Sequence, residues 1–273
     1  MRQQTRSRIA TGLDRTRLLR PAARVREGWL AMRACEGPQA GLDGLPLPPA
    51  RLRLLVDGRS GDPDHFIRIG GQMSDSIRAA VAGSGTAIEE LGAILDFGCG
   101  CGRVARHWAG LEGPEVHGCD YNAELAGWCR RSLPFLRVAR NEVDSPTDYE
   151  SESFDLIYAL SVLSHLSEPL QHLWIAEFRR LLRPGGLLVI SVLGEAVVQR
   201  LTEDERDRFD RGELVVERPR MAGHNACTAY HPRGYVSERL LLGFMDIRRF
   251  DLGSPELELR QDAYIARRPL KLL

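Results

Sequence analysis

A short apolar run that leads into a glycine-rich turn constrains this chain more than any other feature. Residues 93–97 read Ala-Ile-Leu-Asp-Phe, and glycines follow at positions 98, 100 and 102. The run predicts a buried strand, and the glycines predict a turn whose backbone takes positive φ and approaches a ligand closely. A helical pattern over 103–108 would then place free N–H groups beside that ligand. The sequence therefore predicts a strand, a turn and a helix that hold a nucleotide-like molecule.

The spacing of these glycines differs from that of a dinucleotide-binding turn. The dinucleotide fingerprint Gly-x-Gly-x-x-Gly would need glycine at the position that Arg103 occupies. The observed pattern, Asp-x-Gly-x-Gly-x-Gly from Asp96 to Gly102, resembles the first motif of class I S-adenosylmethionine-dependent methyltransferases. The resemblance implies that Asp96 orients the loop. It also implies that Gly98, Gly100 and Gly102 carry the backbone along the methionine end of the cofactor.

Further apolar runs follow in the order that this family requires, and polar residues stand where the runs end. The runs cover 115–120, 135–140, 154–160 and 187–192, and a helix predicted at 170–182 with the turn Arg183-Pro184-Gly185-Gly186 precedes the last of them. The resemblance implies that Asp120 accepts hydrogen bonds from the ribose hydroxyls and that Tyr121 and Asn141 flank the adenine. Ser161, after the run at 154–160, is also expected to contact the cofactor. The likeness is strong over 91–193 and looser over 46–269.

Strands alternate with helices over 93–193, which predicts a parallel sheet with helices on both faces. A helix over 235–242 and two apolar strands at 245–250 and 261–266 follow. In the resembled family such a pair closes the sheet as a hairpin. The predicted fold class is α/β, a Rossmann-like, seven-stranded, mostly parallel sheet with an antiparallel C-terminal hairpin.

The predicted organisation is an Arg-rich extension followed by a methyltransferase domain. The extension, 1–45, has nine arginines against two acidic residues in its first 33 positions, and we expect it to be poorly ordered. A membrane-surface or partner-binding arm and a transit peptide are the alternatives. The domain, 46–273, divides into a helical lid (46–92), the cofactor-binding core (93–193), an acceptor-side insertion (195–233) with a charged helix at 202–211, and a sheet-closing helix and hairpin (234–269).

The lid is expected to consist of two or three helices. Asp64 is the predicted N-cap of a helix that runs past Ile77 to Val81. In the resembled family such helices cover the methionine end of the cofactor. Candidates for that contact are Phe66, Arg68, Gly70 and Gln72, and ordinary amphipathic packing is the alternative for each of them.

Composition narrows the classes of partner. The formal net charge is zero, with 37 basic and 37 acidic residues, and Lys271 is the only lysine. Because the first 33 residues carry about +7, the rest of the chain carries about −7, which argues against a nucleic-acid substrate. No apolar stretch has the length of a signal peptide or of a membrane span, so the expected location is the cytoplasm. The oligomeric state stays open.

Three histidines are candidates for a general base. His165 follows the fourth strand, at the carboxyl edge where open α/β sheets bind ligands, and His224 and His231 lie in the insertion. Histidine titrates near neutral pH and can take a proton from a hydroxyl. Capping or packing is the alternative for His165, and solvation for the other two. No metal is predicted, because Cys227 and His231 make only half a zinc site and the cysteines of the glycine loop occupy its variable positions.

Taken as implied by the resemblance, the function is methyl transfer from S-adenosylmethionine to a small-molecule or glycan-type acceptor, at oxygen rather than nitrogen. The chain has neither a Pro-Cys dipeptide nor an Asn-Pro-Pro-Tyr run, as base methylation would require. A catalytically inactive cofactor-binding protein with a regulatory or scaffolding role is the alternative. An aminopropyltransferase that uses the decarboxylated cofactor is a weaker one.

Overall fold

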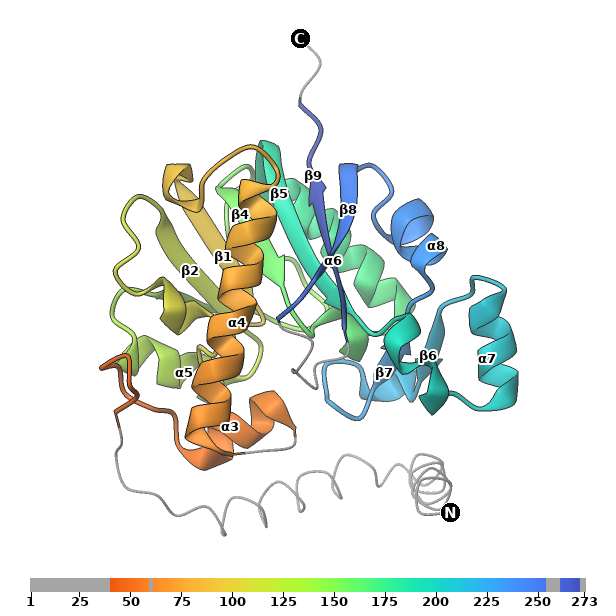
Figure 1. Ribbon diagram of the computed structural model, residues 1–273, viewed down its shortest axis with the longest axis horizontal. Helices are drawn as coiled ribbons and strands as arrows, with labels where there is room; N and C mark the ends of the chain where they lie inside the picture. Colours follow the sequence, from red (N-terminus) through yellow and green to blue (C-terminus); the bar gives the residue numbers. More distant parts are fainter. Residues whose placement is uncertain (1–39, 59–60, 254–260, 271–273) are drawn as a thin grey trace.

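The computed structural model of the chain describes residues 40–58, 61–253 and 261–270, and a seven-stranded sheet lies at its centre (Figure 1). The strands are β1 (Ala93–Phe97), β2 (Glu115–Asp120), β3 (Arg137–Arg140), β4 (Phe154–Ala159), β5 (Leu182–Val192), β8 (Met245–Asp251) and β9 (Asp262–Arg267). Their order across the sheet is β3-β2-β1-β4-β5-β9-β8. The first five are parallel, and β9 is antiparallel to both β5 and β8. The predicted fold class, including the C-terminal hairpin, is confirmed.

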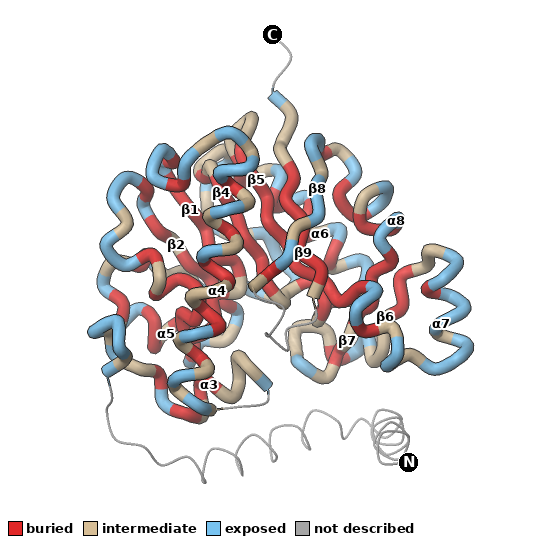
Figure 2. The backbone as a smooth tube through the Cα atoms, in the orientation of Figure 1, coloured by how far each residue is buried: buried red, intermediate tan, exposed pale blue. Residues whose placement is uncertain are grey.

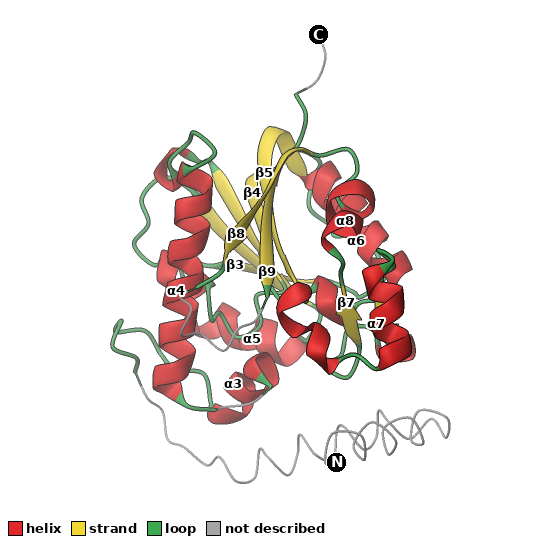
Figure 3. Cartoon of the chain, turned by 45° about the vertical axis from the view of Figure 1, so that its right-hand side comes forward, coloured by secondary structure: helices red, strands yellow, loops and turns green. Residues whose placement is uncertain are grey.

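Helices cover both faces of the sheet (Figure 3). They are α3 (Ala50–Asp57), α4 (Pro63–Ala82), α5 (Ala123–Ser132), α6 (Glu168–Leu181), α7 (Glu203–Asp210) and α8 (Arg233–Tyr235), which continues as a π-helical turn, Val236–Leu240. Residues of α4 and α5 belong to one apolar cluster, and residues of α6 and α8 belong to the other. In the described part of the chain, no helix is long and apolar enough to cross a membrane.

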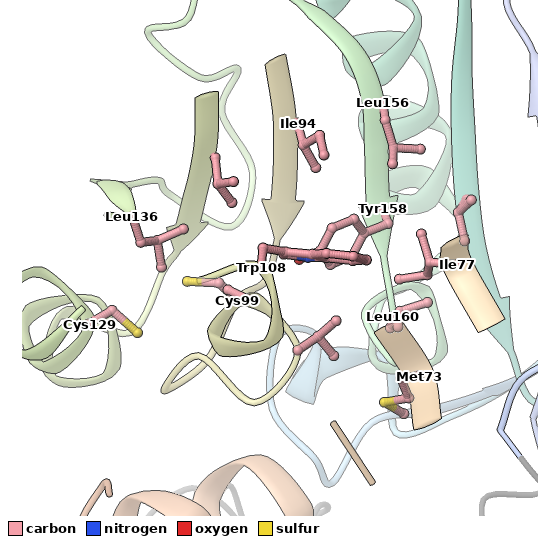
Figure 4. Packing of buried hydrophobic residues seen from close by; sticks show 14 of the residues in the cluster. Met73, Ile77, Ile94, Cys99, Trp108, Cys129, Leu136, Leu156, Tyr158 and Leu160 are labelled. Carbon is pink, nitrogen blue, oxygen red and sulfur yellow. The ribbon is translucent and has the colours of Figure 1, made fainter. Parts of the chain in front are cut away.

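The period-two alternation of the strands sorts their side chains between these two clusters. Ile94 of β1 faces the α4 side, where Trp108 and Tyr158 pack with ring centroids 6.3 Å apart (Figure 4). Phe97 of β1 faces the α6 side and packs against Trp174 at 4.5 Å. The central strands are therefore buried on both faces, as their red colour in Figure 2 shows.

Two helix starts differ from the prediction. The N-cap of α4 is Asp62 rather than Asp64, because Pro63 occupies the first helical position and the Asp62 carboxylate accepts from two backbone N–H groups, including that of His65. After the glycine turn, the chain makes a series of turns and only a short 3₁₀ helix, Ala105–Trp108, in place of the helix predicted over 103–108.

The insertion forms elements of its own, and the end of the extension contacts the segment after the glycine loop. The insertion contains 3₁₀ turns and α7, which is the charged helix predicted at 202–211. It also contains a small antiparallel pair that the sequence did not predict, β6 (Val215–Glu217) and β7 (Thr228–Tyr230). Residues 1–39 of the predicted extension lie outside the described residues. In the described segment, Asp43 accepts from Arg106 at 2.6 Å, so residues just before the predicted boundary contact the domain.

Candidate active site

A cavity lies at the carboxyl ends of the first four strands. Parallel strands that end at one edge leave their following loops around a common crevice. Its wall comes from β1 and the glycine loop (Phe97, Gly98, Gly100, Arg103), the end of β2 (Asp120, Tyr121, Asn122), the loop after β3 (Asn141, Val143), the loop after β4 (Leu160, Ser161, Val162, His165, Leu166), α3 (Leu55, Val56), helices α5 and α6 (Leu125, Trp174) and the insertion (Gly223, His224, Asn225). The predicted cofactor and acceptor sides thus share one cavity.

The glycine loop needs its glycines for two separate reasons. Gly98 and Gly100 have φ of 76° and 57°, and both line the cavity. A Cβ atom on Gly98 would lie 2.5 Å from Val162, and one on Gly100 would lie 2.7 Å from Val56. Both positions therefore exclude a side chain by backbone conformation and by space. Gly102 is not among the described residues of the cavity wall, because it faces Leu133 behind the loop.

The ends of β2 and β3 supply hydrogen-bonding groups at one end of the cavity. Asp120 is buried, and its carboxylate accepts from the backbone N–H of Gly100 and that of Asn122, each at 2.8 Å. Burial raises the pKa of Asp120, whereas these two backbone donors lower it. Tyr121 is exposed at the rim. The buried Oδ1 of Asn141 accepts no hydrogen bond from any residue that the structure describes.

Asp96 lies behind the loop, and among the described residues it does not contribute to the cavity wall. Its buried carboxylate accepts from the Tyr158 hydroxyl and from the backbone N–H of Ala105. Burial raises its pKa to about 7, and the hydrogen bond from Tyr158 opposes that shift. These contacts tie the end of β1 to the segment after the glycine loop, as expected of a residue that orients the loop.

Ser161 reaches the cavity with its polar groups already bonded inside the protein. Its φ is 58°, an uncommon value for a residue other than glycine. Its N–H donates to the Ser191 hydroxyl at 2.7 Å, and its own hydroxyl donates to the Gln261 side chain at 3.0 Å. Ser161 would therefore contact a ligand as part of the surface of the turn and not through its N–H or its hydroxyl.

His165 is the predicted base whose geometry suits proton transfer. It is half-buried in the 3₁₀ helix η3 (Leu163–His165) and lines the cavity. Its Nδ1 lies 2.8 Å from the Cys227 carbonyl, which can only accept, so Nδ1 carries the proton. In the neutral ring the lone pair is then on Nε2. Burial lowers the pKa of His165, which favours this neutral form at neutral pH.

The other two histidines differ in position. His224 lines the cavity, and its Nδ1 accepts from the Ala226 N–H at 3.0 Å, so the neutral ring has its proton on Nε2. His231 is fully buried and is not among the described residues of the cavity wall. Its Nε2 lies 3.0 Å from Gln171, whose amide donates to the carbonyls of Leu163 and Leu166. Burial lowers its pKa to about 3.

The lid contribution comes from a different helix than expected. The wall residues from 46–92 are Leu55 and Val56 of α3, and the four candidates on α4 are not among the described wall residues. The Asn225 amide donates to the Leu55 carbonyl at 3.0 Å, so the insertion is joined to α3 above the cavity. Arg103 also lines the cavity, and its position directly after the third glycine is the one sequence signal that could have identified it.

A model of a family described as a methyltransferase domain matches residues 95–188. Residues 95–188 therefore form a methyltransferase domain. The matched segment runs from β1 into β5 and contains the glycine loop, Asp120, Asn141 and His165. The predicted family is confirmed, and S-adenosylmethionine is the cofactor of this class.

Similar proteins align over the same domain. A ubiquinone biosynthesis O-methyltransferase of Roseobacter denitrificans is 34% identical over 110 residues, which cover 37% of this chain and 40% of that protein. A malonyl-[acyl-carrier protein] O-methyltransferase of Enterobacter lignolyticus is 30% identical over 126 residues, which cover 43% of this chain and 47% of that protein. The chain thus spans less than half the length of these curated relatives.

Solved structures share the fold over a longer stretch. A 1,6-didemethyltoxoflavin-N1-methyltransferase of Burkholderia thailandensis is 21% identical with a TM-score of 0.51, and the match covers 86% of this chain and 94% of that one. An S-adenosylmethionine-dependent methyltransferase of Mesorhizobium loti is 18% identical with a TM-score of 0.52, covering 70% and 96%. The fold that this chain shares with these methyltransferases therefore covers most of its length.

The residues of the cavity fit the cofactor of this class. Gly98 and Gly100 form a cradle that any Cβ atom would fill, which leaves the backbone open to a closely bound ligand. The unbonded Oδ1 of Asn141 is an acceptor, as the exocyclic amine of an adenine requires. Asp120 lies between these two groups in the chain, and its buried carboxylate can accept from ribose hydroxyls.

Proposed function

We propose that this chain is an S-adenosylmethionine-dependent methyltransferase that acts on an oxygen of a small-molecule or glycan-type acceptor. The observation that carries the proposal is the tautomer of His165. Its Nδ1–H donates to the Cys227 carbonyl, which leaves the lone pair of the neutral ring on Nε2. His165 lines the same cavity as the glycine loop. A neutral imidazole at that place is a base for an acceptor hydroxyl.

When bound, the cofactor supplies a methyl group activated by the positive sulfonium. The chain then has to hold donor and acceptor in line and exclude water, which can contribute about 7–11 kcal/mol. We assign that positioning to the glycine loop, Asp120 and Asn141. His165 would take the acceptor proton at Nε2 while the Cys227 carbonyl stabilises the charged ring through Nδ1–H. Such a base contributes about 10²–10⁴-fold.

The character of the acceptor is supported by the rest of the wall. The wall contains the apolar side chains of Val162, Leu166 and Trp174, and among the described wall residues only Arg103 and Asp120 have a formal charge at neutral pH with histidine neutral. This composition favours an uncharged acceptor group with an apolar body. The two curated relatives are both named as O-methyltransferases, which supports oxygen as the methyl acceptor.

The alternative is a protein that binds the cofactor without transfer. The same glycine loop and acid would serve it, whereas a correctly protonated histidine in the cavity would have no role. Methyl transfer is therefore the better supported function. An active enzyme and an inactive binder differ in one observable, the turnover of labelled cofactor in the presence of acceptors.

The decisive experiment is calorimetric titration of the chain with S-adenosylmethionine and with S-adenosylhomocysteine. We expect micromolar binding of both and its loss in Gly100→Arg, because that side chain would enter the cavity against Val56. Gly110→Arg is the matched control, since Gly110 also has a positive φ, 77°, but faces open space. A folded protein that binds neither ligand would contradict the proposal. Binding then justifies a screen of hydroxylated acceptors with a labelled methyl donor.

A further inference from the structure

Arg103 is a buried cation in the cavity wall to which neither the family motif nor the mechanism assigns a role. It directly follows the last glycine of the loop, and only 7% of its surface is exposed. Burial of a guanidinium is costly unless its charge and its N–H donors are matched. The burial lowers the pKa of Arg103, and the nearby Asp57 carboxylate opposes that shift.

The donors of Arg103 are incompletely satisfied. Its Nε is buried and has no hydrogen-bond partner among the residues that the structure describes. Its Nη1 lies 3.7 Å from the Asp57 carboxylate, which is an ion-pair distance and too long for a hydrogen bond. The guanidinium therefore retains donor capacity at the cavity wall, and its planar fork matches a carboxylate.

The backbone around Arg103 is held rigidly. A Cβ atom on Gly70 of α4 would lie 1.9 Å from the Arg103 carbonyl oxygen, so α4 packs directly on this peptide. Asp57, the last residue of α3, forms the ion pair with the guanidinium. Arg103 is thus positioned between the glycine loop and the lid, at the end of the cavity that Val56 and Gly100 form.

We propose that Arg103 binds the carboxylate at the amino-acid end of the cofactor and makes the site selective for carboxylated donors. The proposal rests on the proposed function. A ligand without that carboxylate would leave the buried guanidinium only partly matched. Because the decarboxylated cofactor is the donor for aminopropyl transfer, Arg103 would be the residue that commits this cavity to methyl transfer.

The test compares three ligands by calorimetry. S-adenosylhomocysteine carries the carboxylate, S-adenosyl-3-thiopropylamine is the same molecule without it, and methylthioadenosine lacks both the carboxylate and the amine. We expect the wild-type chain to bind the first at least 10-fold more tightly than the second, since charge-assisted hydrogen bonds are worth about 1.5–3 kcal/mol. In Arg103→Met, the affinity for S-adenosylhomocysteine should fall about 10- to 100-fold and that for the amine should not fall.

Each outcome is decisive. Equal binding of the two longer ligands to the wild-type chain overturns the proposal, with no need for a variant. Loss of S-adenosylhomocysteine affinity in Arg103→Met with unchanged affinity for methylthioadenosine supports it and shows that the variant is folded. If Arg103→Met does not fold, Arg103→Lys replaces it and should show a smaller loss confined to the carboxylated ligand. Failure of all three ligands to bind the folded wild-type chain contradicts the proposed function instead.

Discussion

A chain of buried polar groups supports the loop from behind. The Trp108 indole donates to the Tyr158 hydroxyl at 2.9 Å, and that hydroxyl donates to Asp96. Burial raises the pKa of Asp96 to about 7, although this hydrogen bond lowers it. At the scale of single residues, the carboxylate at the end of β1, to which we assign the orientation of the loop, is therefore also a titrating group near neutral pH.

This titration predicts a pH dependence of stability. In the unfolded chain the pKa of Asp96 is near its ordinary value of 3.8, whereas burial in the fold raises this pKa to about 7. Between these values the unfolded state binds fewer protons, so the free energy of unfolding falls as pH rises and the contribution of Asp96 is lost by about pH 7. Urea unfolding at pH 5 and pH 8 tests this effect. The free energy of unfolding of Asp96→Asn, relative to that of the wild type, should be higher at pH 8 than at pH 5 by on the order of 2–3 kcal/mol. An unchanged difference would argue against the burial effect.

The role of His165 predicts a separation of binding from turnover. In His165→Gln the affinity for S-adenosylhomocysteine should stay within about threefold of wild type, whereas transfer to an acceptor found by the screen should fall 10²–10⁴-fold. Because burial lowers the pKa of His165, the wild-type rate should already be on its plateau at pH 7. His172→Gln, an exposed histidine of α6, is the control and should retain the wild-type rate. Parallel losses of binding and rate would assign His165 to cofactor binding.

At the scale of elements, α4 positions the peptide of Arg103, a role that the sequence of the helix does not predict. Its glycine at 70 allows the helix to contact the peptide of Arg103, and the same helix contributes Met73 and Ile77 to the core (Figure 4). Of the predicted lid residues, Gly70 thus contacts the segment after the glycine loop, while α3 contributes Leu55 and Val56 to the cavity wall.

Two adjacent glycines of α4 allow a matched test of this contact. Gly70→Ala should cost about 1–3 kcal/mol, because its Cβ would overlap the Arg103 carbonyl and the loop would have to shift. It should also weaken S-adenosylhomocysteine binding. Gly71→Ala should change stability by less than about 1 kcal/mol, since its Cβ would approach only the His107 ring at 3.3 Å and alanine favours the helix. Thermal melts of both variants with and without ligand provide the comparison, and equal effects would remove the special role of Gly70.

At the scale of the whole molecule, the cavity joins parts that are distant in the chain. Asn225 of the insertion bonds to Leu55 of α3, and the Gly223 N–H donates to the His165 carbonyl at 2.8 Å. A ligand in the cavity would therefore contact the lid, the sheet and the insertion at once. Binding should stabilise the domain as a unit.

This coupling predicts a thermal shift. S-adenosylhomocysteine at 100 times its Kd should stabilise the fold by about 2.7 kcal/mol, which raises Tm by about 5–10 °C for a domain of this size. Gly100→Arg should show no shift. Differential scanning calorimetry also shows whether the ligand shifts the whole unfolding transition or only a minor transition within it. A shift confined to a minor transition would mean that the lid or the insertion unfolds separately from the sheet.

Local pattern was sufficient for the sheet and for much of the cavity. The strands ending at Phe97 and Asp120 were predicted at the observed residues. The first was predicted because a strand buried on both faces is written as a continuous apolar stretch, and the second because of its distance from the glycine loop and its terminal acid. Strand order followed from the resemblance. Since the loops of parallel strands meet at one edge, Gly98, Asp120 and Asn141 could be assigned to a common crevice before any coordinates.

The insertion and the lid could not be assigned in that way. The sequence gives no reason to distinguish His224 from His231. In the structure His224 lines the cavity, whereas His231 is buried against Gln171. Their difference depends on how a segment without strong periodicity packs against η3 and β5.

The sequence by itself determined the fold class and the family, and it indicated the loop to which we assign the cofactor, because periodicity and glycine spacing are local properties of the chain. Only the tertiary structure decided which nitrogen of His165 carries the proton and that Arg103 is buried with an unmatched donor. Both depend on groups far away in the chain, the Cys227 carbonyl and Asp57 at the end of α3. Hydrogen bonds and desolvation act through space, so their partners are known only once the chain has folded.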